Sequence, residues 1–277
     1  LCEAGQKTLI RFLLVSADLK AKYILLRVLK KLPIHLRLYT MSFLNKADLF
    51  LSKADCRRIF LPLIEMDFKQ ALTTLLLIQD LKNIAVLDDK MCFDLLMDSL
   101  YDDFMLIRAN LLTELSFMYS DPLMKQATQI LKNVQATEEQ KKVALSTMDD
   151  ILPKKYRFLR LVIQDGTLST RLEKLPVHLL KNKTQFNLQF AFILRGMSYR
   201  SVWTKLCALT CIRRLNDTSL CADVAQLLTD KNAQIRWYSL WVLDALVQDK
   251  KQRKKWFLPL EHDSNKDVCQ LANSLLQ

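Results

Sequence analysis

Positively charged side chains are dense in one part of the chain. The 277 residues include 41 Lys or Arg and 29 Asp or Glu, a formal net charge of +12. Residues 141–214 hold 15 basic and 4 acidic residues, whereas residues 1–140 and 215–277 are nearly neutral. Clustered cations bind nucleic-acid phosphates or anionic lipid head groups. We therefore expect an anionic partner to contact Lys154, Lys155, Arg157, Arg160, Arg195, Arg200, Lys205, Arg213 and Arg214.

A second basic run, Lys250–Lys255, is followed by Trp256. The eight acidic residues among residues 215–277 balance the eight basic ones. Charge runs of this kind are usually solvated. We interpret the run as a solvated loop.

Residues that could form a metal or catalytic site do not combine into one. Cys207 and Cys211 lie four residues apart, but no His lies nearby to complete a zinc site. The paired acids, Asp88-Asp89, Asp102-Asp103 and Asp149-Asp150, are better explained as helix caps or surface charges. Three glycines are too few for a phosphate-binding loop. We expect no cofactor, no metal, no small-molecule substrate and no enzymatic activity.

The elements that carry these residues are predicted to be helices. Apolar residues recur at i, i+3, i+4 and i+7, and the alternation typical of strands is nearly absent. Pro33 ends one helical pattern, and Pro122 suits the first turn of another. Thr137 with Gln140 predicts a capping box, and Asp102 or Asp103 is placed at a helix start. The predicted fold class is all-α.

One register recurs along the chain. A basic residue is followed by apolar or small residues at +3, +4, +7 and +10, starting at Lys22, Arg108, Lys141, Lys205 and Arg236. Intervals of 33 and 31 residues separate successive copies, and the interval between Lys141 and Lys205 fits two units. The pattern indicates an internal repeat, clearest over 199–277 and less regular over 166–198. We expect a single helical-repeat domain over 1–277.

A last copy of the register puts Cys269 at the basic position, 33 residues after Arg236, and we call these first positions the anchors. An aspartate precedes several anchors by six residues, as Asp230 precedes Arg236 and Asp263 precedes Cys269. This pattern resembles the HEAT repeat, within the armadillo and HEAT superhelix class. The resemblance implies an α-solenoid of antiparallel helix pairs. It also implies that the aspartate caps the second helix of each pair and that the basic residue ties back to it. Such a stack offers an extended surface rather than a deep pocket.

A further resemblance concerns Ala144–Leu152, Leu159–Asp165 and Trp203–Leu209. These segments are similar to the helical-repeat regions attached to ATP/ADP translocase-like membrane carriers. The resemblance implies a cytoplasmic module, tethered to the membrane through segments outside this chain. An anionic membrane surface or a fused carrier would then join a protein as expected partners.

An alternative follows from Trp237 and Trp241, which share a helical face with Asp244 nearby. Aromatic and acidic residues on a helical surface resemble HEAT-like alkylpurine DNA glycosylases, which implies nucleic-acid binding through the basic 141–214 face. Packing or a repeat interface is the favoured interpretation of the tryptophans. The favoured function is a non-enzymatic scaffold or regulatory module that binds another macromolecule.

Overall fold

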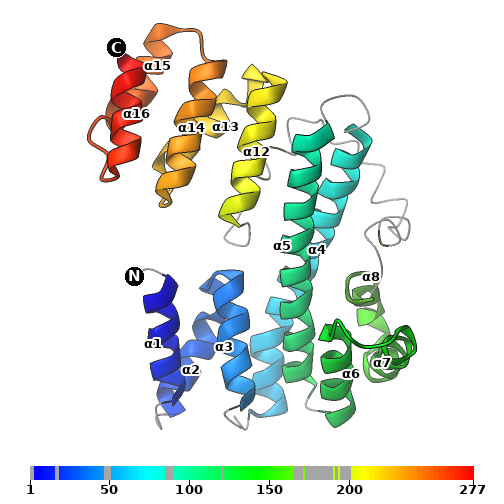
Figure 1. The fold of residues 1–277 in the computed structure, drawn as a ribbon. Coiled ribbons are helices and arrows are strands. Elements are labelled where there is room, and N and C mark those ends of the chain that lie inside the picture. Colours follow the sequence, from blue (N-terminus) through cyan, green and yellow to red (C-terminus); the bar gives the residue numbers. More distant parts are fainter. Residues whose placement is uncertain are drawn as a thin grey trace. The chain divides into compact units, whose positions relative to one another are not determined.

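The computed structural model shows a chain built from helices (Figure 1). In its described part, thirteen α-helices and no strand occur, and 87% of the residues are helical. The predicted all-α fold class is confirmed. The structure describes residues 3–15, 19–46, 51–84, 90–119, 121–164, 171, 190, 193 and 201–277.

The chain divides into two compact units. Unit 1 comprises Leu1–Leu76 and Phe104–Val177, and unit 2 comprises Leu77–Asp103 and His178–Gln277. Two long helices, α4 (Lys53–Ile84) and α5 (Lys90–Met118), contribute residues to both units. The single-domain organisation expected from the sequence stays a prediction. Most of the less regular region expected at 166–198 lies outside the described residues.

Unit 1 begins with short helices whose apolar faces are buried. Leu25, Leu26 and Leu29 lie on one such face, and Pro33 follows it. Proline disfavours a helical conformation in the residue before it, and Leu32 is extended, so the pattern ends where predicted. The elements are α1 (Glu3–Val15), α2 (Leu19–Val28), the 3₁₀ helix η1 (Leu29–Lys31) and α3 (Ile34–Lys46).

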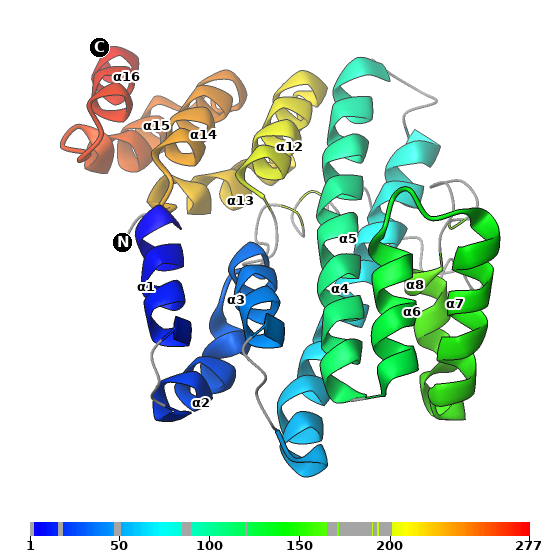
Figure 2. The same cartoon turned by 60° about the horizontal axis from the view of Figure 1, so that its bottom comes forward.

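Helices α6 (Pro122–Lys132) and α7 (Glu138–Ile151) pack against each other in unit 1 (Figure 2). Pro122 occupies the first turn of α6, where a missing N–H costs nothing. The Thr137 hydroxyl accepts from the Gln140 N–H, and the Gln140 side chain accepts from the Thr137 N–H. Both predicted helix starts are confirmed. The 3₁₀ helix η2 (Lys154–Leu159) and α8 (Arg160–Ile163) follow.

The core of unit 1 contains a buried ionisable cluster. Arg37 of α3 donates to Asp67 of α4 at 2.8 Å, and its Nη1 lies 3.6 Å from a Glu114 oxygen on α5. All three side chains are at most 2% exposed. Burial raises the pKa of Asp67 and holds the pKa of Glu114 well above its ordinary value, with the nearby Asp67 carboxylate adding to the second shift.

In unit 2, α14 (Ala233–Leu246) packs between α12 (Val202–Leu215) and α16 (Lys266–Leu276) (Figure 1). We call α12, α14 and α16 the row helices. Shorter elements lie between them in the chain: η3 (Thr218–Leu220), α13 (Cys221–Gln226), η4 (Leu227–Thr229), α15 (Lys250–Phe257) and η5 (Leu258–Leu260). Small residues of the repeated register, Ala208, Ser239 and Ala272, are fully buried on the three row helices. They allow close helix contact.

Ion pairs repeat along unit 2 with the same register. Lys205 of α12 lies 3.1 Å from Asp230, and Arg236 of α14 contacts Asp263 at 2.6 Å. In each pair the aspartate comes from the turn before the next row helix, 25 or 27 residues further on. Each of these carboxylates therefore pairs with the basic residue of the preceding helix, whereas the resemblance implied the basic residue of its own helix. Arg236 does donate to the backbone carbonyl of Asp230 at 2.8 Å.

The helix caps also differ from the expectation. Asn232 and Asn265 are the N-cap residues of α14 and α16, while Asp230 and Asp263 accept from the N–H groups of these two asparagines. The aspartates thus shape the turn and leave the cap to asparagine, since an Asx side chain bonds the backbone two residues on. Placing aspartate as the cap was wrong.

Two further sequence predictions are corrected. Asp102 and Asp103 start no helix, because α5 runs unbroken from Lys90 to Met118. Asp103 is buried instead, and within unit 2 it accepts from the Thr204 hydroxyl at 2.8 Å and from the Ser201 N–H at 3.3 Å. The basic run placed in a loop forms helix α15, whose N-cap is Asp249.

Candidate functional site

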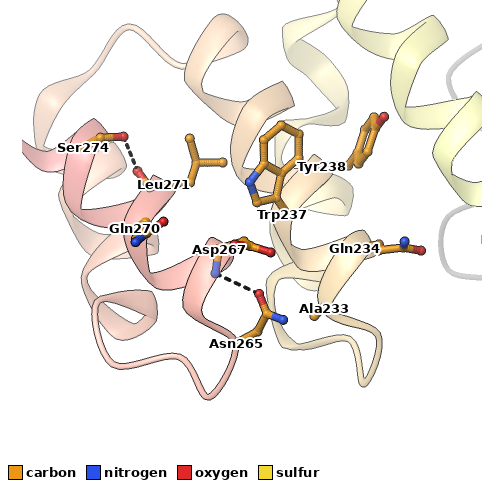
Figure 3. A pocket seen from close by; sticks show the side chains of 9 residues that line it. All are labelled: Ala233, Gln234, Trp237, Tyr238, Asn265, Asp267, Gln270, Leu271 and Ser274. Carbon is orange, nitrogen blue, oxygen red and sulfur yellow. Dashed lines mark hydrogen bonds between the residues drawn. The ribbon is translucent and has the colours of Figure 1, made fainter.

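A groove lies between α14 and α16 of unit 2 (Figure 3). Its volume is about 710 Å³, within the range of ligand-binding pockets. The lining combines aromatic, aliphatic, amide and carboxylate groups. We call it the α14–α16 groove, and its residues are Ala233, Gln234, Trp237, Tyr238, Asn265, Asp267, Gln270, Leu271 and Ser274.

Local sequence rules position the two walls of the groove. Asn232 caps α14 through the Gln234 N–H, and Asn265 caps α16 by accepting from the N–H groups of Asp267 and Val268. The two caps hold equivalent turns of α14 and α16 opposite each other. Trp237 in α14 corresponds by register to Gln270 in α16, one residue beyond the shared anchors at Arg236 and Cys269.

Trp237, Leu271 and Asp267 point into the same space, whereas Gln234 and Tyr238 extend toward α12 (Figure 3). The Trp237 and Tyr238 rings meet edge-on with centroids 5.3 Å apart, and Tyr238 meets Trp241 at 5.8 Å. Edge-to-face contacts of this kind limit ring motion. The indole is therefore held as a half-buried wall facing exposed Asp267 and Gln270.

This arrangement suits an extended peptide with a basic side chain. An indole face attracts a cation, and the Asp267 carboxylate supplies the opposite charge on the facing helix. The Gln270 amide can donate and accept, and the Asn265 amide can donate while its oxygen caps α16, which matches the N–H and C=O groups of a peptide backbone. Asp267 is the only charged residue among those lining the groove.

The expected basic contact residues are scattered through the structure. In unit 1, Lys154 is exposed and Arg160 pairs with Asp149 at 2.5 Å. Lys155 and Arg157 lie within η2, with their side chains outside the described part, and Arg195 and Arg200 lie outside the described residues.

In unit 2, the predicted contact residues lie on α12. Lys205 binds Asp230, and the Arg213 guanidinium stacks 3.5 Å from the centre of the Trp241 ring while donating to the Trp241 carbonyl. Arg214 is exposed at the end of the same helix. At least three of the nine predicted cations therefore make internal contacts. Lysine and arginine side chains can join neighbouring helices of the same fold as well as bind a partner.

The residues of the glycosylase-like alternative are engaged differently from the expectation. Trp241 lies beneath Arg213, and Asp244 pairs with Arg253 of α15. Trp237 alone of the three lines the groove. The alternative required an exposed Trp241 ring beside a carboxylate that is available to a ligand. Instead, both side chains are in contact with arginines.

The cysteines of α12 are part of the core. Cys207 and Cys211 are buried on the side of the helix that also buries Ala208. Among the residues that the structure describes, no cluster of His, Cys, Asp and Glu has the geometry to hold a metal ion. In the same residues, no helix is long and apolar enough to cross a membrane.

Comparison with protein-family models, curated proteins and solved structures finds no match to this chain. The class that the fold defines is therefore an all-helical protein, and no family is identified.

Sequence reasoning found Trp237 but missed the residues opposite it. Gln270 and Leu271 lie one and two residues after Cys269, at the positions that Trp237 and Tyr238 hold after Arg236. Aligning the repeats by their anchors places these pairs on neighbouring helices. The register was thus sufficient to suggest the groove, but only the structure shows that the space between the helices is open.

Proposed function

We propose that this chain is a HEAT-like helical-repeat interaction module of α-solenoid type that acts without catalysis. Its α14–α16 groove binds an extended segment of a partner protein, and a basic side chain of that segment lies between Trp237 and Asp267. The observation that carries the proposal is the opposition of an aromatic wall and a single carboxylate across an open groove. The successive ion pairs Lys205–Asp230 and Arg236–Asp263 support the repeat assignment.

This proposal changes the expected partner surface. Arg160 and Lys205 are paired with aspartates and Arg213 is stacked on Trp241, so these three side chains are engaged within the protein rather than by a partner. The groove, in contrast, presents negative charge. No observation favours the nucleic-acid alternative in this region, since Trp241 and Asp244 are bound to arginines.

Selection from a displayed library of random peptides tests the proposal. We expect wild-type protein to enrich peptides with a Lys or Arg flanked by apolar residues. In titration calorimetry with the enriched peptides, Trp237→Ala should weaken binding about 30-fold, the cost of removing an interface tryptophan worth about 2 kcal/mol. Trp203→Ala is the matched control, because Trp203 is 56% exposed on α12 and lies outside the groove.

Gln270→Lys provides a second variant whose folding is not at risk, because Gln270 is exposed. The added cation should repel the basic peptide and weaken binding at least as much as Asp267→Asn does. Failure to enrich any peptide, or equal affinity for wild type, Trp237→Ala and Gln270→Lys, would refute the proposed groove function.

A further inference from the structure

Helix α15 of unit 2 presents a face made of lysine. Lys250, Lys251, Lys254 and Lys255 are all exposed. At 3.6 residues per turn, these four positions fall within an arc of about 140° around the helix. The four side chains therefore form one continuous positive surface, which we call the lysine face.

The side of α15 next to Lys250 and Lys254 is anchored in unit 2 by Arg253 and Phe257, each three residues after one of these lysines. Phe257 is fully buried, and Leu260 of η5 is 7% exposed. Arg253 pairs with Asp244 of α14, and its guanidinium lies 5.8 Å from the centre of the Phe257 ring. These contacts fix the rotation of the helix about its axis, so the lysine face is directed outward before any partner binds.

An exposed apolar group extends the lysine face. Leu258 is 47% exposed and follows Lys254 by four residues and Lys251 by seven, which places it on the same side as both. Pro259 beside it is exposed as well. The surface thus combines four ammonium groups with a leucine at the end of the helix.

The acidic residues of the C-terminal segment do not neutralise this surface. Asp230, Asp244 and Asp263 are held in ion pairs with Lys205, Arg253 and Arg236. Asp217 caps η3, and Asp249 caps α15. Formal neutrality over residues 215–277 therefore hides a separation of charge, since five of the eight acidic residues serve ion pairs or caps and Asp267 lines the α14–α16 groove, whereas four lysines share one helix.

We propose that the lysine face attaches the protein to the surface of an anionic lipid bilayer. Lysine ammonium groups on flexible stems reach anionic head groups, at about 1 kcal/mol per lysine. Leu258 enters the boundary between head groups and acyl chains.

A bilayer fits the composition of this face better than a nucleic acid does. The face itself has no Arg for bidentate contacts to bases and no aromatic ring for base stacking: Arg253 is paired with Asp244, and the half-buried Trp256 lies about 100° around the helix from Lys255. An exposed leucine gains nothing beside a phosphate backbone. In contrast, it gains by leaving water for the bilayer.

Co-sedimentation with vesicles tests this proposal on the full chain. We expect binding to phosphatidylcholine vesicles that contain phosphatidylserine and no binding to phosphatidylcholine alone. Replacing all four lysines by Gln should abolish binding, since each lysine contributes about five-fold. The matched control replaces four exposed lysines of unit 1, Lys30, Lys31, Lys125 and Lys142, by Gln; it should bind like wild type.

Two leucine variants distinguish insertion into the membrane from electrostatic attraction alone. Leu258→Ser should weaken vesicle binding about ten-fold, the loss expected for one buried leucine. Leu123→Ser removes a leucine that is 56% exposed on α6 and should have no effect. Because all these side chains are exposed, circular dichroism should show unchanged folding.

Three results would overturn the proposal. One is wild-type protein that fails to sediment with anionic vesicles, and another is vesicle binding that survives the four lysine changes of α15. The third is tight binding to duplex DNA that requires the same lysines and is indifferent to Leu258→Ser, which would assign the face to nucleic acid. None of these outcomes bears on the α14–α16 groove, since no residue of the lysine face lines it.

Discussion

Arg37, Asp67 and Glu114 bring one positive charge and two carboxyl groups into the core of unit 1. Two ionised carboxylates beside one guanidinium would leave a net buried charge, which is costly at low dielectric. The pKa of Glu114 is held well above its ordinary value of 4.5, mainly by burial and then by the neighbouring Asp67 carboxylate. We infer that folding favours the protonated form of Glu114 relative to the unfolded chain.

This protonation gives stability a defined pH dependence. A carboxyl whose pKa rises on folding contributes most to the free energy of unfolding below its unfolded value, here 4.5. The contribution is lost as pH rises toward the raised folded pKa. Glu114→Gln cannot ionise, so relative to this variant the wild type should lose stability between pH 4.5 and neutrality. Urea denaturation at several pH values measures the difference.

The matched control for this prediction is Glu65→Gln, since Glu65 is exposed on α4. Its stability should follow the wild-type pH profile. A Glu114→Gln profile that stays parallel to wild type throughout this range would show that Glu114 ionises normally in the folded protein.

At the scale of elements, the turns before α14 and α16 each use an aspartate and an asparagine in the same roles. Asp230 and Asp263 each accept from an asparagine N–H two residues on and bind a basic side chain from the preceding row helix. The turn geometry and the link between neighbouring helices thus depend on one carboxylate. The Arg236 hydrogen bond is the largest cause that lowers the pKa of Asp263.

Asp263→Ala should reduce the free energy of unfolding by about 2 kcal/mol, because it removes hydrogen bonds to a charged partner that is 11% exposed. Asp263→Asn keeps a side-chain oxygen that can accept from the Asn265 N–H, so this variant should lose less stability than Asp263→Ala. A lowered pKa contributes stability above the ordinary value of 3.8 that disappears as pH falls through the folded pKa. The wild type should show this acid loss, and both variants should lack it. Equal stability of all three proteins would contradict the role of the ion pair.

At the scale of the whole molecule, residues far apart in the sequence close unit 2. Asp103 of α5 accepts from Thr204 and Ser201 at the start of α12, about a hundred residues later. Ser99, one turn earlier on α5, lies 2.6 Å from the Thr204 hydroxyl. This buried polar contact positions the first row helix and, through it, the helices that follow.

Asp103→Ala should destabilise the protein by about 2–3 kcal/mol, because it removes a buried carboxylate that accepts from the Thr204 hydroxyl and leaves the Ser201 N–H without its acceptor. Hydrogen exchange should increase first at the N-terminal turn of α12. Asp102→Ala is the neighbouring control: Asp102 is exposed on α5, and its loss should change stability by less than about 0.5 kcal/mol. Similar exchange in the two variants would argue against this link.

Local features were predictable from the sequence because their partners are near in the chain. The Thr137–Gln140 capping box joins residues three apart, and Pro122 starts α6 through its own geometry. The register of Lys205 and Arg236 identified the buried faces of α12 and α14, since helical period alone decides which side chains share a face. Asp102 and Asp103 were misplaced because helix breaks were assumed at acids that α5 carries in its interior.

The sequence alone determined that the chain is helical, where many of its helices begin, and that a basic and small-apolar register repeats in unit 2. Only the tertiary structure decided which charges are available to a partner. Arg160, Lys205 and Arg213 are used by neighbouring helices, whereas the lysines of α15 remain exposed although their segment is formally neutral. A net charge counts residues along the chain. A surface potential depends on which oppositely charged side chains meet, and those pairs join positions that periodicity does not connect.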